Sequence, residues 1–384
     1  MRILKFIRNF FIILSIYLTV DVIFFYLLPN DLKTNLYNNR AHRIKSFYYH
    51  HDLRPMASFY DQWGYEKYKI FTNNLGFKDK SNREIEFKKK NILFIGDSFT
   101  EGVGIKYEDT FVGIIDDKLK SIKNDVEVLN AGVQSYSTSI YLSKIHYLLN
   151  IKKLPITDVV IVVSGGDIFD DAFKYMEVDE DYILNHVDHK NKTMIKLINF
   201  IKSNTLIYQI ISRITPPKVI PSLVMSLFEK QDEVKNYEMR EKELKKISNE
   251  EILKMNFLNH KDYSYLYSIK EFDDWGKKSI DYSIENLKKI AEMTNKNNIS
   301  LNILYIYEPI IILKKPNKQL FSYLIESFKS LEKYDVNFFE ISDFYKQYEN
   351  KFDAYKGLFF INDIHLNKQG NNRVANEIIQ KIKF

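Results

Sequence analysis

The chain has 384 residues, with 56 lysines and arginines against 50 acidic residues and a formal net charge of +6. The charges are scattered along the sequence, whereas nucleic-acid binding normally needs a focused basic face, so we expect no nucleic-acid partner. Cysteine is absent, which excludes disulfides, thiolate catalysis and cysteine metal sites. The length allows one large domain with insertions or two smaller domains.

The N-terminus carries an apolar run from residue 10 to residue 28, interrupted by Asp21. As a helix this run reaches roughly 28 Å, which nearly matches a bilayer core. Asp21 costs about 2.5 to 3.5 kcal/mol on insertion, and the many Ile, Leu, Phe and Val residues, at about 0.3 to 0.6 kcal/mol each, outweigh it. No small-residue cleavage site follows. We therefore predict an uncleaved transmembrane signal anchor over 10–28, with a cleaved signal peptide and a buried core helix as alternatives.

The charges beside this run predict its orientation. Arg2, Lys5 and Arg8 precede it and favour a cytoplasmic tip over 1–9, although basic residues such as Lys33 and Arg40 on the far side weaken the asymmetry. We expect a single-pass membrane protein whose remaining chain lies outside the cytoplasm, in the periplasm or at the cell surface.

The segment 29–88 is polar and rich in tyrosine, with turn signals at Trp63-Gly64 and at 73–76. We predict a stalk, or N-terminal extension, that packs against a catalytic body. His50 and His51 within it are expected to be a solvated pair.

The segment 89–384 alternates short apolar runs with helical patterns, which is typical of parallel βαβ units. The predicted strands are 91–95, 126–129, 158–163, 300–306 and 335–339. We therefore predict an α/β domain with about five parallel strands. The alternation breaks from about 172 to 275, where charged, helix-like pieces predict a helical insertion.

A serine stands where the first predicted strand ends and its helix begins, in Gly96-Asp97-Ser98. Open α/β sheets bind ligands at the carboxyl ends of their strands, so Ser98 is expected at the edge of a site. A hydroxyl needs a positioned base to act as a nucleophile, and His365 is the candidate. Asp363 lies two residues before it, and residues two apart in an extended segment point to the same side. We predict Ser98, His365 and Asp363 as nucleophile, base and acid.

These residues resemble the motifs of the SGNH/GDSL hydrolase family, with Gly-Asp-Ser at 96–98 and Asp-Ile-His at 363–365. Asn-Ala-Gly at 130–132 looks like the second block of the family, and Gly-Gly-Asp at 165–167 looks like the third. The resemblance covers roughly residues 89 to 171 and 278 to 384. It implies a three-layer, flavodoxin-like α/β/α fold and a serine-dependent acyl-ester enzyme without a cofactor.

The resemblance also implies an oxyanion hole built from the backbone N–H groups of Ser98 and Gly132. The third block of the family usually presents an asparagine whose side chain is a further donor, and here Gly166 occupies that position. The N–H group of Gly166 could help in its place. Since the loss of one donor can cost about 10² to 10³ in turnover, we expect a slow enzyme or a different geometry.

The short spacing between acid and histidine, the anchor and the element Asn-Leu-Gly-Phe at 74–77 are similar to the envelope branch of the family, which handles acyl groups on polysaccharides. This implies an acyl-enzyme on Ser98 that is released to water by an esterase or to a sugar hydroxyl by an O-acetyltransferase. The expected substrate is an acylated glycan or another ester. A transferase would need an acyl donor from an integral-membrane acyltransferase partner. The alternative is a non-catalytic carbohydrate-binding or scaffolding protein.

Four further features have ordinary explanations. His186 and His189 have the spacing of metal ligands on a helix, but no further pattern supports them and we predict no metal site. Asp170 and Asp171 are expected to cap the following helix, with a place along the pocket as the alternative, and Asn367 is expected to cap the last helix. Glu308 is expected to lie in a turn, with a place at the border of the site as the alternative.

Overall fold

The computed structural model describes residues 2–28, 43–63, 66–175, 197–198, 200–201, 204–211 and 246–384. Much of the predicted helical insertion, including His186 and His189, lies outside the described residues.

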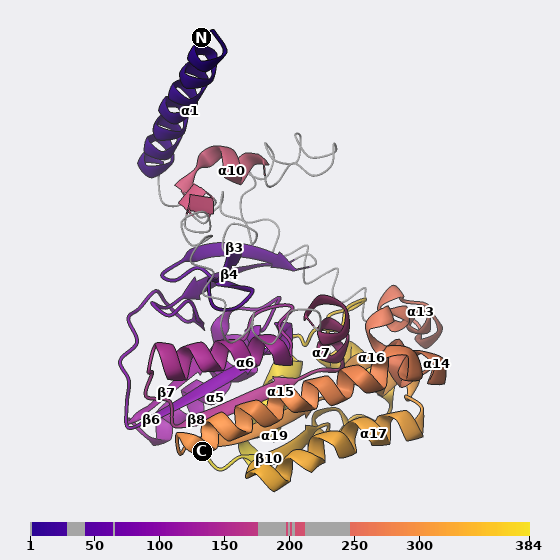
Figure 1. Cartoon of the computed structure of the whole chain (residues 1–384). Helices are drawn as coiled ribbons and strands as arrows, with labels where there is room; N and C mark the ends of the chain where they lie inside the picture. Colours follow the sequence, from indigo (N-terminus) through magenta and orange to yellow (C-terminus); the bar gives the residue numbers. More distant parts are fainter. Residues whose placement is uncertain are drawn as a thin grey trace.

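A sheet of eight strands forms the centre of the body, in the order β10-β9-β8-β6-β7-β5-β4-β3 (Figure 1). Five neighbouring strands are parallel: β6 (Lys90–Gly96), β7 (Val126–Asn130), β8 (Asp158–Val163), β9 (Ser300–Ile306) and β10 (Val336–Ile341). They confirm the five predicted strands. Their side chains are buried on both faces, because helices cover both sides of a parallel sheet.

Helices lie on the two faces of this sheet. The chain moves from β6 to β7 in one direction and then back across β8, β9 and β10, so right-handed crossovers place the intervening helices on opposite faces. One face carries α5 (Phe111–Ile122), which packs against α19 (Lys368–Lys381). The other carries α6 (Thr138–His146), which packs against α15 (Lys277–Lys296). The predicted three-layer α/β/α arrangement is confirmed.

The N-terminal segment contributes strands that were not predicted. β3 (Ser58–Trp63), β4 (Glu66–Thr72) and β5 (Lys78–Asp79) run antiparallel and extend the sheet from β7, where Lys78 pairs with Asn130. Two shorter strands, β1 (Arg43–Lys45) and β2 (His51–Leu53), pair separately. The prediction of a stalk is therefore wrong for this part of 29–88, which belongs to the central sheet.

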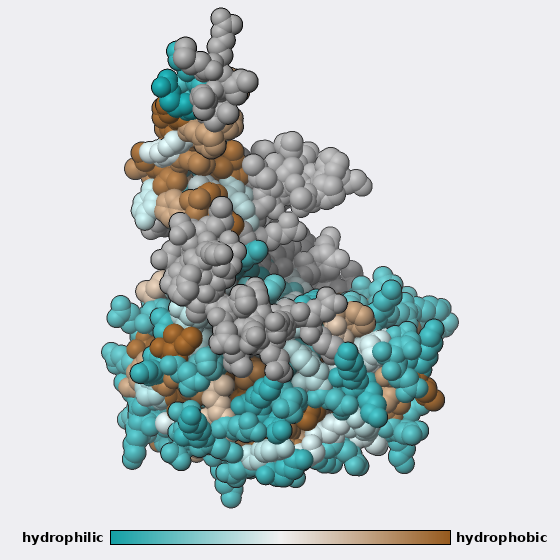
Figure 2. Space-filling model, in the orientation of Figure 1, coloured by the Kyte–Doolittle hydropathy of each residue, from teal (hydrophilic) through white to brown (hydrophobic). Residues whose placement is uncertain are grey.

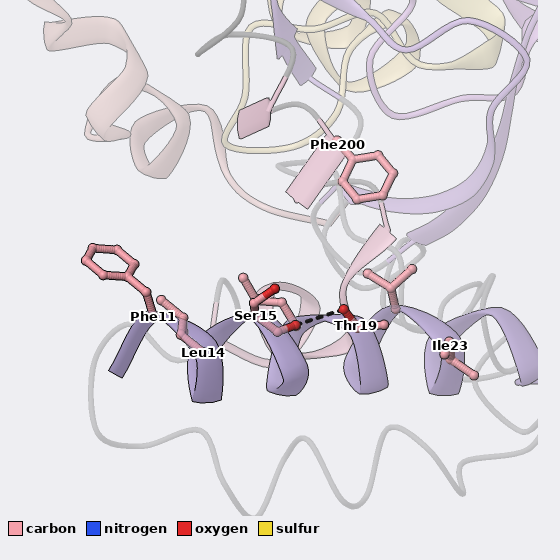
Figure 3. A pocket seen from close by; sticks show the side chains of 8 residues that line it. Phe11, Leu14, Ser15, Thr19, Ile23 and Phe200 are labelled. Carbon is pink, nitrogen blue, oxygen red and sulfur yellow. Dashed lines mark hydrogen bonds between the residues drawn. The ribbon is translucent and has the colours of Figure 1, made fainter. Parts of the chain in front are cut away.

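The N-terminal helix α1 (Arg2–Leu27) contains the stretch Arg8–Leu27, which is long and apolar enough to cross a membrane, with a mean hydropathy of 2.3. Figure 1 shows it projecting from the body, and Figure 2 shows hydrophobic side chains along it, whereas the visible surface of the body is mainly hydrophilic. One side of α1 and Phe200 line an apolar groove (Figure 3).

Asp21 in this helix has a hydrogen-bond partner. Its Oδ1 accepts from the backbone N–H of Ile207, at 3.2 Å, in α10 (Leu206–Ile211). A carboxyl group in an apolar environment is costly unless it is hydrogen-bonded, so this contact would offset part of the cost of placing Asp21 in a bilayer.

A buried ion pair fixes the N-terminal segment to the body. The Lys144 ammonium lies 2.9 Å from Asp52 Oδ1, and it also donates to the backbone carbonyl of Ala131 at 3.1 Å. The Lys144 side chain is fully buried. A buried charge of this kind is tolerated only with such partners.

Replacing Lys144 with methionine is expected to lower the free energy of unfolding by about 3 to 5 kcal/mol, because Asp52 would lose its counter-ion inside the protein. Thermal unfolding of the full chain in detergent, followed by circular dichroism, measures this. Lys278→Met, on an exposed part of α15, is the matched control. Equal unfolding midpoints for the two variants would contradict the expectation.

Candidate active site

Ser98 lies at the junction between β6 and the short helix α4 (Ser98–Glu101). Asp97 caps this helix, because its side chain accepts from the backbone N–H of Phe99 at 2.9 Å. The strand can pass into the helix here only with glycine at position 96. A Cβ atom on Gly96 would lie 2.1 Å from Thr100 Oγ1 and 2.7 Å from the carbonyl oxygen of Val162.

The structure brings the three predicted residues together. His365 Nε2 lies 2.8 Å from Ser98 Oγ, and His365 Nδ1 lies 2.6 Å from Asp363 Oδ1. The same Asp363 oxygen accepts from the backbone N–H of His365 at 2.8 Å. Asn367 caps α19 directly after the histidine, as predicted, by accepting from Gly370 N–H.

The environment of Asp363 keeps it ionised. Burial alone would raise the pKa of Asp363, but hydrogen bonds from His365 and Trp63, with the charge of His365, hold this pKa below its usual value. An ionised carboxylate beside Nδ1 fixes the proton on that nitrogen and leaves Nε2 to accept the Ser98 proton.

Trp63 is a member of this cluster that sequence reasoning missed. Its indole Nε1–H donates to Asp363 Oδ2 at 2.9 Å. The two residues are 300 positions apart, and Trp63 stood out in the sequence only as part of a turn signal. No local pattern indicates their contact, because only the register of the unpredicted strand β3 brings it about.

The Gly132 N–H group, predicted as an oxyanion donor, is engaged within its own loop. It donates to Asn130 Oδ1 at 3.1 Å. The backbone N–H groups of Ser98 and Gly166 have no acceptor within the described part of the protein. Both remain available to a ligand.

A tyrosine hydroxyl lies beside Gly166. A Cβ atom on Gly166 would be 3.5 Å from Tyr263 Oη, so the hydroxyl faces the space that a longer side chain at this position would enter. Tyr263 is 2% exposed, and its hydroxyl is also close to the carboxyl of Glu308. The third-block loop therefore has a hydrogen-bonding side chain beside it, supplied by another part of the chain.

Buried carboxyl groups support the loop that carries Gly166. Glu308 accepts from the backbone N–H of Gly165 at 2.5 Å, and Ser164 Oγ donates to Asp97 Oδ2 at 3.0 Å. Burial raises the pKa of Glu308 to about 8 and that of Asp97 to about 6. The expectation that Glu308 lies in an ordinary turn is wrong, since it is fully buried beneath this loop.

Two further expectations are corrected. His51 is not a solvated residue, because its Nε2 hydrogen-bonds the carbonyl oxygen of Gln134 at 2.8 Å. Asp171 does not cap the helix that follows it. It is buried and accepts from Ser139 N–H at 3.3 Å, at the start of α6, whereas Asp170 pairs with Lys174.

In the described part of the chain, no three His, Asp or Glu side chains are placed to hold a metal ion.

No protein-family model and no curated protein matches the sequence. Among solved structures, TesA is similar, with 10% identity over 77% of this chain and 98% of its own and a TM-score of 0.40. The acetylxylan esterase Axe2 from Geobacillus stearothermophilus shows 11% identity, 78% and 96% coverage and a TM-score of 0.38. The esterase EstA from Pseudoalteromonas sp. shows 12% identity, 76% and 96% coverage and a TM-score of 0.37. Identity is low in each case, so we derive the chemistry from the residues of this chain.

The raised pKa of Glu308 predicts how stability changes with pH. Because the folded state holds this proton up to about pH 8, whereas an ordinary glutamate releases it near pH 4.5, the stabilisation present below pH 4.5 is lost as the pH rises towards 8. Glu308→Gln, which keeps the acceptor for Gly165, should remove a pH dependence of at most roughly 5 kcal/mol.

Unfolding by denaturant at several pH values measures this dependence. Glu292→Gln, on an exposed part of α15, provides the control for a change of charge without burial. The prediction fails if the stability of Glu308→Gln falls with pH as steeply as that of the wild type.

Proposed function

We propose that the chain is a serine acyl-ester enzyme of the SGNH/GDSL family, which forms an acyl-enzyme on Ser98. The observation that carries this proposal is the hydrogen-bonded series from Ser98 Oγ to His365 Nε2, at 2.8 Å, and from His365 Nδ1 to Asp363 Oδ1, at 2.6 Å. A hydroxyl, an imidazole and a carboxylate in this order form the arrangement that activates serine for attack on a carbonyl carbon.

In the first step, Ser98 Oγ attacks the ester carbonyl while His365 Nε2 takes the hydroxyl proton. The tetrahedral intermediate then collapses, the bond to the leaving alkoxide breaks, and His365 returns the proton to that alkoxide. In the second step, His365 removes a proton from water or from a sugar hydroxyl, whose oxygen attacks the acyl-enzyme. The bond from the acyl carbon to Ser98 Oγ then breaks, and His365 returns the proton to Ser98 Oγ. Asp363 stabilises the imidazolium in both steps.

The negative charge of the intermediate needs donors. The backbone N–H groups of Ser98 and Gly166 have no acceptor within the described residues, and the Tyr263 hydroxyl lies beside Gly166. We assign these three groups to the oxyanion hole, with Tyr263 as its side-chain donor once its hydroxyl turns from Glu308 to the intermediate. Each donor aimed at the developing charge contributes most in a site with little water, and Tyr263 is buried.

The apolar helix α1 supports a position at the membrane. In the proposed arrangement it anchors the protein as a single pass, with residues 1–9 in the cytoplasm and the α/β domain in the periplasm or at the cell surface. An acylated envelope glycan is then the substrate, and an acyl group is released to water or transferred to a glycan hydroxyl. A transferase would receive its acyl donor from an integral-membrane acyltransferase. The second candidate, a carbohydrate-binding protein without turnover, is favoured by the absence of a donor side chain at Gly166.

Hydrolysis of 4-nitrophenyl acetate by the full chain in detergent tests the proposal. Ser98→Ala and His365→Ala should each lower turnover by roughly 10³-fold or more, because the nucleophile or its base is missing. Ser121→Ala, an exposed serine on α5, should match the wild type. An inactive wild type, or active-site variants as active as it, would favour the binding protein. Addition of an oligosaccharide acceptor, with mass analysis of the products, distinguishes transfer from hydrolysis.

The role of Tyr263 has a separate test. Tyr263→Phe should lower kcat by roughly 10²-fold with little change in KM, since an oxyanion donor acts in the transition state. Tyr267→Phe removes a hydroxyl from the same segment that donates to the carbonyl oxygen of Ile310, and it should leave kcat almost unchanged. If both variants keep the wild-type kcat, Tyr263 is not a donor to the intermediate.

A further inference from the structure

The geometry points to Trp63 as a positioning residue of the active site, supplied by the N-terminal segment and acting through Asp363 and His365. This inference deepens the proposed function and rests on it. Trp63 neither gives nor takes a proton in the proposed reaction. It orients the carboxylate that orients the histidine.

The hydrogen bonds of Asp363 are divided between its two oxygens. Oδ1 accepts from His365, through both Nδ1 at 2.6 Å and the backbone N–H at 2.8 Å, whereas Oδ2 accepts from Trp63 Nε1 at 2.9 Å. Within the residues that the structure describes, Trp63 is the side chain that donates to Oδ2. Without it, the carboxylate could rotate about its bond to Cβ and take Oδ1 away from the imidazole.

The indole ring also contacts the histidine directly. The ring centroids of Trp63 and His365 are 4.7 Å apart and the planes are nearly perpendicular, at 79°. Phe99 contacts the imidazole as well, with centroids 5.5 Å apart. Aromatic contacts of this geometry are favourable and restrict the orientation of the imidazole. Trp63 therefore restrains both members of the pair that must align with Ser98.

Trp63 can act in this way because its strand is fixed. It is the last residue of β3, where it pairs with Glu66 of β4, and β4 pairs through β5 with β7 of the parallel sheet. Phe59 and Ile70 of this hairpin are buried at 0% and 1% exposure. Trp63 is thus part of the same sheet as β6, the strand that leads into Ser98.

Two further contacts join the same N-terminal segment to the region after Ser98. Arg43 forms a bidentate pair with Glu101 of α4, at 2.9 and 2.6 Å. The buried Lys78 ammonium donates to the carbonyl oxygens of Gly102 and Ile105, at 2.8 and 2.6 Å. The segment therefore contacts the chain that follows Ser98 and, through Trp63, the carboxylate of Asp363. Its position determines how well the serine and the histidine align.

The protein offers a direct spectroscopic test, because it has only two tryptophans, Trp63 and Trp275. Trp275 donates to Glu271 on another part of the chain, so Trp275→Phe leaves Trp63 as the single indole emitter. A protonated imidazole in contact with an indole quenches its fluorescence. We expect the emission of full-length Trp275→Phe to rise as His365 loses its proton, and to lose this pH dependence when His365→Ala is added.

Kinetics of ester hydrolysis provide the second readout. Trp63→Phe keeps a ring but loses the N–H donor, and it should lower kcat by roughly 10²-fold with KM nearly unchanged, since small misalignments of catalytic groups have effects of that size. Trp63→Ala should lower kcat further, whereas Trp275→Phe should stay within about twofold of the wild type.

The possible results separate the two proposals. The positioning role is overturned if the pH dependence of Trp63 emission is the same with and without His365→Ala. It is also overturned if Trp63→Phe keeps the wild-type kcat and an intact circular dichroism spectrum. If the wild type hydrolyses no ester, the proposed function fails, and the fluorescence titration still decides whether Trp63 lies on the Asp363–His365 pair.

Discussion

The hydrogen bond between Ser98 Oγ and His365 Nε2 joins residues 267 positions apart and is 2.8 Å long. The two residues come within this distance only when the sheet and the segments that flank it have folded. Ser98 is fixed at the end of β6 because Gly96 lets the backbone turn against Thr100 and Val162. His365 is fixed by its own carboxylate partner and by the cap of α19 that follows it. Neither residue could be moved by an ångström without loss of the proton transfer that the proposed chemistry requires.

Buried charges hold the loops around this bond. Burial alone would raise the pKa of Glu101, but its pair with Arg43 holds that pKa below its usual value, so the ionised carboxylate can also accept from Gln134 N–H at 2.6 Å. Lys78 and Lys144 perform similar tasks on neighbouring loops. A buried pair contributes little net stability compared with replacement of both partners by apolar residues, whereas loss of one partner alone is costly. The N-terminal segment supplies Arg43 and Lys78 and so takes part in holding these loops.

The parts of the fold that were predictable have signals local to the sequence. Continuous apolar runs such as 158–163 are typical of strands buried on both faces, and Ser98 stands at the end of a parallel strand, where such sheets place ligands. β3 was missed because one of its faces is exposed, so Phe59 alternates with the half-exposed Tyr60 and no continuous run appears. Trp63 and Tyr263 were missed for a different reason. Their roles depend on the tertiary position of their side chains, which no spacing encodes.

The distance between anchor and site limits what the enzyme could reach. With α1 in the bilayer as proposed, residues 28 and 43 are joined by 15 peptide units, which span at most roughly 50 Å even when fully extended. From residue 43 onward the N-terminal segment is bound to the body through Arg43, Asp52, Trp63 and Lys78. The catalytic centre is therefore confined to a layer close to the membrane surface. Under the proposed function, the substrate would be an ester presented within that layer, on a glycan at or near the bilayer.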